Sequence, residues 1–220
     1  NEFDDFTGYQ LEYRGIRHYC ATYDQSQEFE KFMTRWFGER GIGVKQWSPI
    51  RPITKLVVAR VLSRRYPHLF RLAMSCHSPV YRGGRLVPCG RCFKCTGVIL
   101  FLLANGIDPA LLGYERRSYA DLPRRILEHR YRIGEAELEH SAYLANSIWG
   151  LKLPHASPHP RIEMMLFDEL SSHVDAIPYC GVRERVFEVL ERYTAGYAWH
   201  RGGRWVETTR EEVLRAGGCR

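Results

Sequence analysis

Residues 75–108 read SCHSPVYRGGRLVPCGRCFKCTGVILFLLANGID and contain four of the chain's seven cysteines. Cys76, Cys89, Cys92 and Cys95 follow the spacing Cys-x12-Cys-x2-Cys-x2-Cys. The two short steps let successive sulfurs converge on one ion, and the longer loop returns the first sulfur to the same place. Four thiolates are typical of a closed, structural zinc site, although soft thiolates also accept an iron–sulfur cluster. We predict one structural zinc ion per chain.

Basic residues surround these cysteines. Arg82, Arg91 and Lys94 would offset the double negative charge of a four-thiolate zinc centre, and His77 is expected to be a neighbour of the metal rather than a ligand. An apolar helix is predicted to follow from Phe93 to Ala104, ended by the Asn-Gly pair at 105–106.

Strands and helices alternate before the cysteines. Buried strands are predicted at residues 16–21 and 44–47, one helix capped by Asp24 lies between them, and a second helix begins at Thr54. This order indicates a parallel α/β layer. Two short strands cannot form a stable parallel sheet alone, so we expect an upstream segment or a partner chain to complete it. After residue 113 the patterns predict helices at 119–130, 135–148, 161–173 and 182–195.

The composition restricts the class of protein. The chain has 220 residues, of which 45% are apolar and 26% charged, which excludes a disordered chain. The longest apolar run, residues 98–104, is far shorter than the ~20 residues that span a bilayer, so we expect no membrane helix. A clustered, odd number of cysteines favours a metal site in the reducing cytoplasm over a disulfide framework. The net charge of +7 permits a nucleic-acid partner, but the arginine pairs are scattered.

The ordered motifs resemble the C-terminal half of the 7-cyano-7-deazaguanine synthase-like ATP pyrophosphatases. Residues 48–62, SPIRPITKLVVARVL, are similar to that family's Pro-Leu-x-x-Leu-Thr-Lys helix start, and the stretch from Ser75 to Asp108 resembles its Ser-Cys and CGxCxxC loop. Upstream, residues 1–10 (NEFDDFTGYQ) and 23–29 (YDQSQEF) resemble its strand-end and turn motifs. A related branch, the epimerase that acts on UDP-N-acetylmuramoyl-dipeptide, is similar in the same segments.

The resemblance implies a fold and an activity. Residues 1–114 would be the zinc-binding half of a Rossmann-like domain with a parallel sheet, and residues 115–220 a helical, Arg-rich addition. The enzyme would use ATP and magnesium to activate a small-molecule carboxylate, and the two branches differ in the substrate. The residues expected to bind substrate or nucleotide are Asp5, Tyr23, Asp24, Ser26, Glu28 and Lys55.

One family motif is absent from the 220 residues. The Ser-Gly-Gly-x-Asp-Ser loop, which presents backbone N–H groups to pyrophosphate, does not occur. We therefore expect this chain alone to be inactive, and the Asn at position 1 suggests that a segment carrying the loop precedes it. The alternative from another class is a non-catalytic, zinc-stabilised module that binds nucleic acid or protein, which a basic stripe with exposed aromatic residues would favour.

Overall fold

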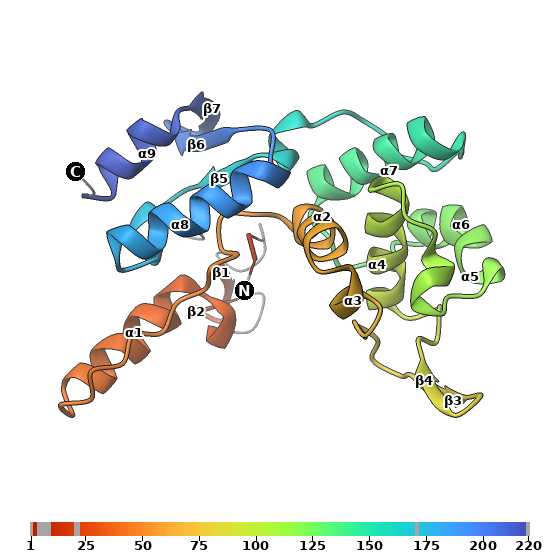
Figure 1. The fold of residues 1–220 in the computed structure, drawn as a ribbon, viewed down its shortest axis with the longest axis horizontal. Helices are drawn as coiled ribbons and strands as arrows, with labels where there is room; N and C mark the ends of the chain where they lie inside the picture. The colour runs from red at the N-terminus through yellow and green to blue at the C-terminus, as the bar shows by residue number, and fades with distance from the viewer. Residues whose placement is uncertain (1, 4–9, 20–22, 170–171, 219–220) are drawn as a thin grey trace. The chain divides into compact units, whose positions relative to one another are not determined.

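The computed structural model describes residues 2–3, 10–19, 23–169 and 172–218. Contacts divide the chain into two compact units, a first unit of residues 1–58 and 161–220 and a second unit of residues 59–160. Helix α2, Lys55–Arg65, passes from one unit to the other (Figure 1). The division predicted at 114/115 falls within the second unit.

The first unit holds a small mixed sheet. Strand β5 pairs parallel with β6, and β6 pairs antiparallel with β7. Phe167 of β5 packs edge-on against Phe187 of α8 at 5.6 Å and stacks on Tyr197 of β6, so α8 covers one side of the sheet. The elements are β5 Met165–Phe167, η4 Val174–Ala176, α8 Cys180–Leu190, η5 Glu191–Tyr193, β6 Tyr197–Arg201, β7 Arg204–Thr208 and α9 Arg210–Ala216.

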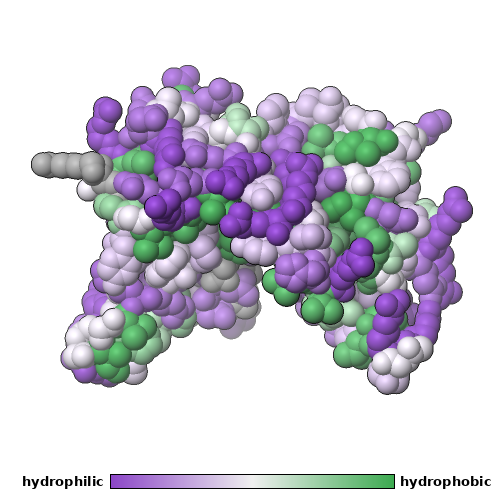
Figure 2. Space-filling view, viewed as in Figure 1, coloured by the Kyte–Doolittle hydropathy of each residue, from purple (hydrophilic) through white to green (hydrophobic). Residues whose placement is uncertain are grey.

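An antiparallel hairpin and a long helix complete the first unit. Ser26 begins helix α1 because its Oγ accepts the Phe29 N–H at 3.1 Å, so Ser26 and not Asp24 is the N-cap. The apolar face of α1 is only half-buried, with Phe32 40% exposed, and Figure 2 shows apolar side chains on this surface. The elements are β1 Gln10–Tyr13, β2 Ile16–Tyr19, η1 Tyr23–Gln25 and α1 Gln27–Gly38.

The second unit is helical around one hairpin. Helix α4 spans Phe93–Ala104 as predicted and packs against α7, burying Ile99, Leu100, Leu138 and Ala142. A run this apolar needs cover on all sides, which α6 and α7 provide. The remaining elements are α3 Pro67–Phe70, β3 Val80–Arg82, β4 Arg85–Val87, η2 Pro109–Leu112, α5 Arg116–Ala120, α6 Leu122–Leu127, α7 Glu135–Trp149 and η3 Pro160–Glu163, the last of which crosses into the first unit.

Three predicted elements are wrong in type or in pairing. The strand at residues 16–21 forms as β2, but in an exposed antiparallel hairpin with β1. Residues 44–47 are not a strand, because the Gln46 N–H bonds to the Thr34 hydroxyl of α1 at 3.0 Å instead of to a sheet. The helix predicted at 161–173 is replaced by β5. Since β5–β6 is the one parallel pair among the described strands, the predicted Rossmann-like sheet is not confirmed.

The described residues include no helix that is both long enough and apolar enough to cross a membrane.

Candidate metal centre

The four predicted ligands converge. The Sγ atoms of Cys76, Cys89, Cys92 and Cys95 all lie within 4.8 Å of one another. The Cys76–Cys92 distance is 4.0 Å, Cys89–Cys95 is 3.8 Å and Cys92–Cys95 is 3.5 Å. Four sulfurs placed about 2.3 Å from a central ion at tetrahedral corners would be ~3.8 Å apart. The cluster therefore has the dimensions of a site for a single ion.

Local backbone structure places each sulfur. Cys76 and Cys89 flank the β3–β4 hairpin, whose turn at Gly83-Gly84 has positive φ at both glycines and brings the chain back on itself. Cys92 is the N-cap of α4, and Cys95 lies in its first turn. The 12-residue spacer is thus a hairpin, and the two Cys-x-x-Cys steps turn into a helix.

Burial and backbone hydrogen bonds shift the pKa values of the cysteines in different directions. Burial opposes ionisation of Cys92, but amide hydrogen bonds from His77 and Cys95 lower its pKa to about 7. Burial raises the pKa of Cys76 and of Cys95. His77 therefore contributes its backbone N–H to a ligand, as a neighbour of the site.

Two buried side chains, Tyr114 and Arg125, lie next to the cysteine loop. Tyr114, 4% exposed, lies beside Cys95, and burial together with the negative charge of a Cys95 thiolate raises the pKa of Tyr114. The guanidinium of Arg125, 1% exposed, donates to the Gly90 carbonyl at 2.8 Å and to the Thr96 hydroxyl at 3.2 Å. Within the described residues Nη2 of Arg125 has no hydrogen-bond partner. A buried cation with unused N–H groups beside four thiols fits a negatively charged metal–thiolate centre.

Arg125 was not predicted as a residue of the metal centre, although its position on α6 indicates that it is buried. Leu122 and Ile126 form the buried face of α6, and Arg125 lies on that face, three residues after Leu122. An arginine on the apolar side of a short helix is rarely buried without a partner. The predicted cations Arg82, Arg91 and Lys94 are instead exposed, and Arg82 pairs with Glu115.

Residues 113–125, which extend beyond the stretch that resembles the family, pack against the cysteine loop. A Cβ added to Gly90, which has φ +70°, would lie 2.8 Å from Ser118 Cβ and closer still to its hydroxyl. A Cβ on Gly113 would contact Val87 of the hairpin at 3.5 Å. Residues 113–125 therefore pack closely against the cysteine loop and its hairpin.

The other predicted site residues lie in the first unit. Tyr23 and Asp24 are exposed in η1, Glu28 is exposed in the first turn of α1, and the Ser26 hydroxyl donates to the Tyr23 carbonyl at 2.7 Å. Nζ of Lys55 lies 4.0 Å from Glu2 Oε1. Asp5 lies outside the described residues. Ser26 is thus engaged as a helix cap, while Tyr23, Asp24 and Glu28 present side chains to solvent.

A buried ion pair between Arg51 and Glu30 holds η1 and the start of α1 in place. This pair was not predicted from the sequence. Nη2 of Arg51 lies 2.6 Å from Glu30 Oε1, with both side chains at most 5% exposed. Nη1 of Arg51 also donates to the Gln25 carbonyl at 2.9 Å. Arg51 therefore connects η1 and α1 to the loop that leads into α2.

Comparison with protein-family models, curated proteins and solved structures gives no match for the chain. Outside the cluster, Cys180 at the start of α8 is disulfide-bonded. The family resemblance and the cytoplasmic location stay predictions.

Proposed function

We propose that the four cysteines bind one zinc ion with a structural role, and that the chain is the zinc-bearing part of an ATP-dependent, carboxylate-activating enzyme. The observation that supports the metal is the tetrahedral spacing of the four sulfurs. An iron–sulfur cluster places several irons and bridging sulfides between its thiolates, which would need them further apart.

Bound zinc would cross-link the β3–β4 hairpin to helix α4. With four thiolates and no open position, it would stabilise the fold rather than activate water. The chain's own residues hold the ligands in place: Arg125 donates to the Gly90 carbonyl between two of the cysteines, and the backbone N–H of Cys89 donates to Cys76 Sγ at 3.3 Å.

The catalytic part of the proposal rests on the ordered motif resemblance. In such an enzyme a carboxylate oxygen of the substrate attacks the α-phosphorus of ATP, and the bond to the leaving pyrophosphate breaks. Magnesium and the phosphates would be held by the missing Ser-Gly-Gly-x-Asp-Ser loop. Asp5, Tyr23, Asp24, Glu28 and Lys55 are the proposed contacts to substrate or nucleotide on this chain, with Ser26 positioning them as the cap of α1.

Native mass spectrometry and thermal unfolding test the metal. We expect one zinc per chain, and Cys92→Ser should lose the metal and lower the melting temperature, whereas Lys152→Gln, exposed and outside the cluster, should do neither. If Cys92→Ser does not fold, a chelator added to the parent chain should cause the same loss. A metal-free parent chain, or unchanged melting after chelation, would contradict the proposal.

ATP–pyrophosphate exchange by the protein with any segment encoded before residue 1 tests the catalytic part separately. Asp24→Asn and Lys55→Gln should each lower exchange by about tenfold or more, while Lys152→Gln in the second unit should not. Absence of exchange with every carboxylate tried would overturn the enzyme assignment and leave the metal assignment standing.

A further inference from the structure

The two units differ sharply in charge. The second unit carries 15 Lys and Arg against seven Asp and Glu, a net charge of +8 with His neutral. The first unit carries 17 against 18, a net charge of −1. A general preference for arginine would make both units basic. The excess positive charge lies instead entirely in the unit that holds the metal centre.

Within the second unit the charge is concentrated around the cysteines. Residues 59–107 contain eight Lys and Arg and no Asp or Glu. Four of these cations, Arg82, Arg85, Arg91 and Lys94, lie between the first cysteine and the last, and all four are exposed. The convergence of the sulfurs holds the hairpin and the Cys-x-x-Cys loops together, so these four cations share one region of the surface.

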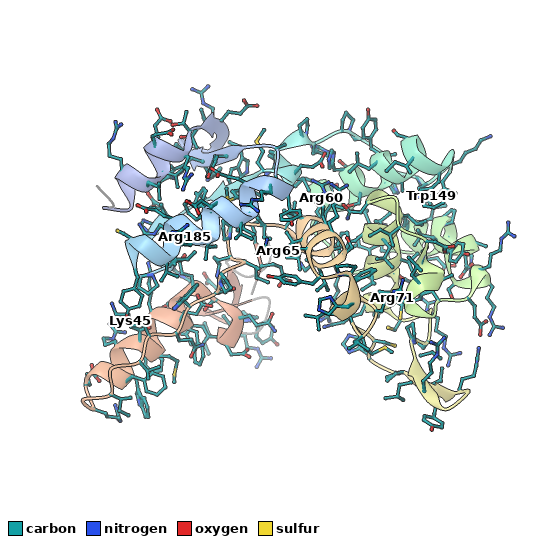
Figure 3. The ribbon with its side chains drawn as sticks, viewed as in Figure 1. Lys45, Arg60, Arg65, Arg71, Trp149 and Arg185 are labelled. Atoms are coloured by element: carbon teal, nitrogen blue, oxygen red, sulfur yellow. The ribbon has the colours of Figure 1, made fainter. Side chains whose placement is uncertain are left out.

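The other four cations of this stretch lie before the first cysteine in the sequence. They are Arg60, Arg64, Arg65 and Arg71, on α2 and just after α3. Figure 3 labels Arg60, Arg65 and Arg71 along these helices.

Exposed aromatic rings accompany the cations. Tyr81 on β3 is 75% exposed, and Phe93 at the start of α4 is 47% exposed. Each is next to a cation in sequence, Tyr81 before Arg82 and Phe93 between Arg91 and Lys94. In Figure 1 the hairpin (yellow) projects from the helices of its unit, which leaves Tyr81 accessible.

We propose that this hairpin–loop surface, formed by Tyr81, Arg82, Arg85, Arg91, Phe93 and Lys94, binds single-stranded nucleic acid. Cationic side chains follow the phosphates, and exposed rings stack on bases that a duplex would keep paired. The contact of Arg82 with Glu115 does not neutralise the surface, because Glu115 is shared with Arg117. This inference goes beyond the proposed enzyme and does not depend on carboxylate activation.

The chain contains a matched control hairpin. The β6–β7 turn in the first unit has the same Arg-Gly-Gly-Arg sequence, at 201–204, as the β3–β4 turn at 82–85. Both glycines have positive φ in each turn. The second hairpin, however, belongs to the unit with net charge −1, and its Arg201 stacks on Trp199 at 4.0 Å. Reversing the charge of either arginine pair changes the net charge of the chain equally.

Fluorescence anisotropy of the zinc-loaded full chain with labelled oligonucleotides of about 16 residues tests the proposal. The probes are oligo(U), oligo(dT), a duplex of equal length and inorganic polyphosphate, from about 50 to about 200 mM salt. We expect single strands to bind most tightly. The comparison of oligo(U) with oligo(dT) shows whether the surface prefers RNA or DNA. Arg82→Glu with Arg85→Glu should weaken binding at least tenfold and lower the salt slope by about 1.4. Arg201→Glu with Arg204→Glu should leave binding within about twofold.

A stacking role is tested with a second pair of variants. Tyr81→Ala should weaken oligonucleotide binding by about tenfold without changing the salt slope, whereas Tyr13→Ala, 63% exposed beside the β1–β2 turn, should not. Circular dichroism and zinc content should match the parent chain in all variants. The proposal is overturned by an absence of salt-dependent binding, by equal losses in the two hairpin variants, or by duplex or polyphosphate binding as tight as single-strand binding.

Discussion

Nη1 of Arg125 donates a hydrogen bond of 2.8 Å to the carbonyl oxygen of Gly90, inside the cysteine loop. Arg125 comes from α6 and is fully buried, so its charge has left water to make this contact. Such burial is costly unless nearby negative charge compensates for it. Asp121 Oδ2 lies 3.7 Å from Nε of Arg125 and supplies part of that charge, and four cysteine sulfurs on one metal ion would add to it. The helical segment after residue 113 and the metal centre therefore stabilise each other.

Replacing Arg125 by Met tests this coupling. The variant leaves the Gly90 carbonyl without its donor and removes the buried cation, so we expect a loss of about 2–4 kcal/mol in the free energy of unfolding. Apparent zinc affinity should also fall by about 10- to 100-fold. Urea titration and competition with a chromogenic chelator measure the two effects.

The neighbouring Arg124 is the control for this variant. Its side chain is 61% exposed and pairs with Asp121 on the surface, so Arg124→Met should change stability by less than ~0.5 kcal/mol. Equal effects of the two substitutions would mean that Arg125 does not support the metal centre.

Zinc binding should release protons. The pKa values of Cys76 and Cys95 are raised above the usual 9.0, so both are thiols near pH 7.5 and must lose their protons to bind metal. The pKa of Cys92, about 7, makes it largely a thiolate there. We expect at least two protons per zinc, and zinc-dependent stability that is present at higher pH and lost as pH falls.

Calorimetry in buffers of different ionisation enthalpy measures this release. With two protons released, the apparent zinc affinity should fall by about 100-fold for each pH unit of acidification around neutrality. A release of fewer than one proton would show that the thiols are already ionised in the metal-free chain.

Prediction succeeded where local sequence decides the structure. Helix α4 begins and ends where the apolar run and the Asn-Gly pair place it, and the cysteine spacing identified all four converging sulfurs. Helix α9 likewise has a capping box between Thr209 and Glu212, the Thr-x-x-Glu pattern that marks a helix start. In each case the interactions that fix the element join residues close together in the chain.

The prediction failed where contacts between residues far apart in the sequence determine the structure. Four successive buried residues, 164–167, suit either a helix or a strand, and β5 forms because β6 and the Pro52 carbonyl, which accepts the Leu166 N–H at 2.7 Å, lie beside it. Residues 44–47, Val-Lys-Gln-Trp, are predicted as a strand, but the Gln46 N–H bonds to the Thr34 hydroxyl of α1. Arg125 reaches Gly90 across 35 positions, which no local pattern reveals.

The buried pair of Arg51 and Glu30 gives a third test. Glu30→Gln leaves the Arg51 charge buried without its counterion, so we expect a loss of about 3–5 kcal/mol in urea unfolding. The double variant Glu30→Met with Arg51→Met should recover most of that loss. Lys31→Gln, at an exposed pair 3.8 Å from Asp175, should have almost no effect. A near-zero cost for Glu30→Gln would mean that the pair is not buried in solution.

Gly90→Ala tests the packing of α5 on the cysteine loop. Gly90 has φ +70°, and its added Cβ would meet the Ser118 side chain, so strain and overlap together should cost about 2–4 kcal/mol. Gly84→Ala has a similar φ of +79° but open space around it, so it should cost only about 1 kcal/mol. Adding Ser118→Gly to Gly90→Ala should restore part of the difference, because it removes the overlapping atoms and leaves the backbone strain. Thermal and urea unfolding of the zinc-loaded variants measure each step. If the two alanine variants lose the same stability, or if Ser118→Gly brings no recovery, then α5 does not lie against the loop between Cys89 and Cys92.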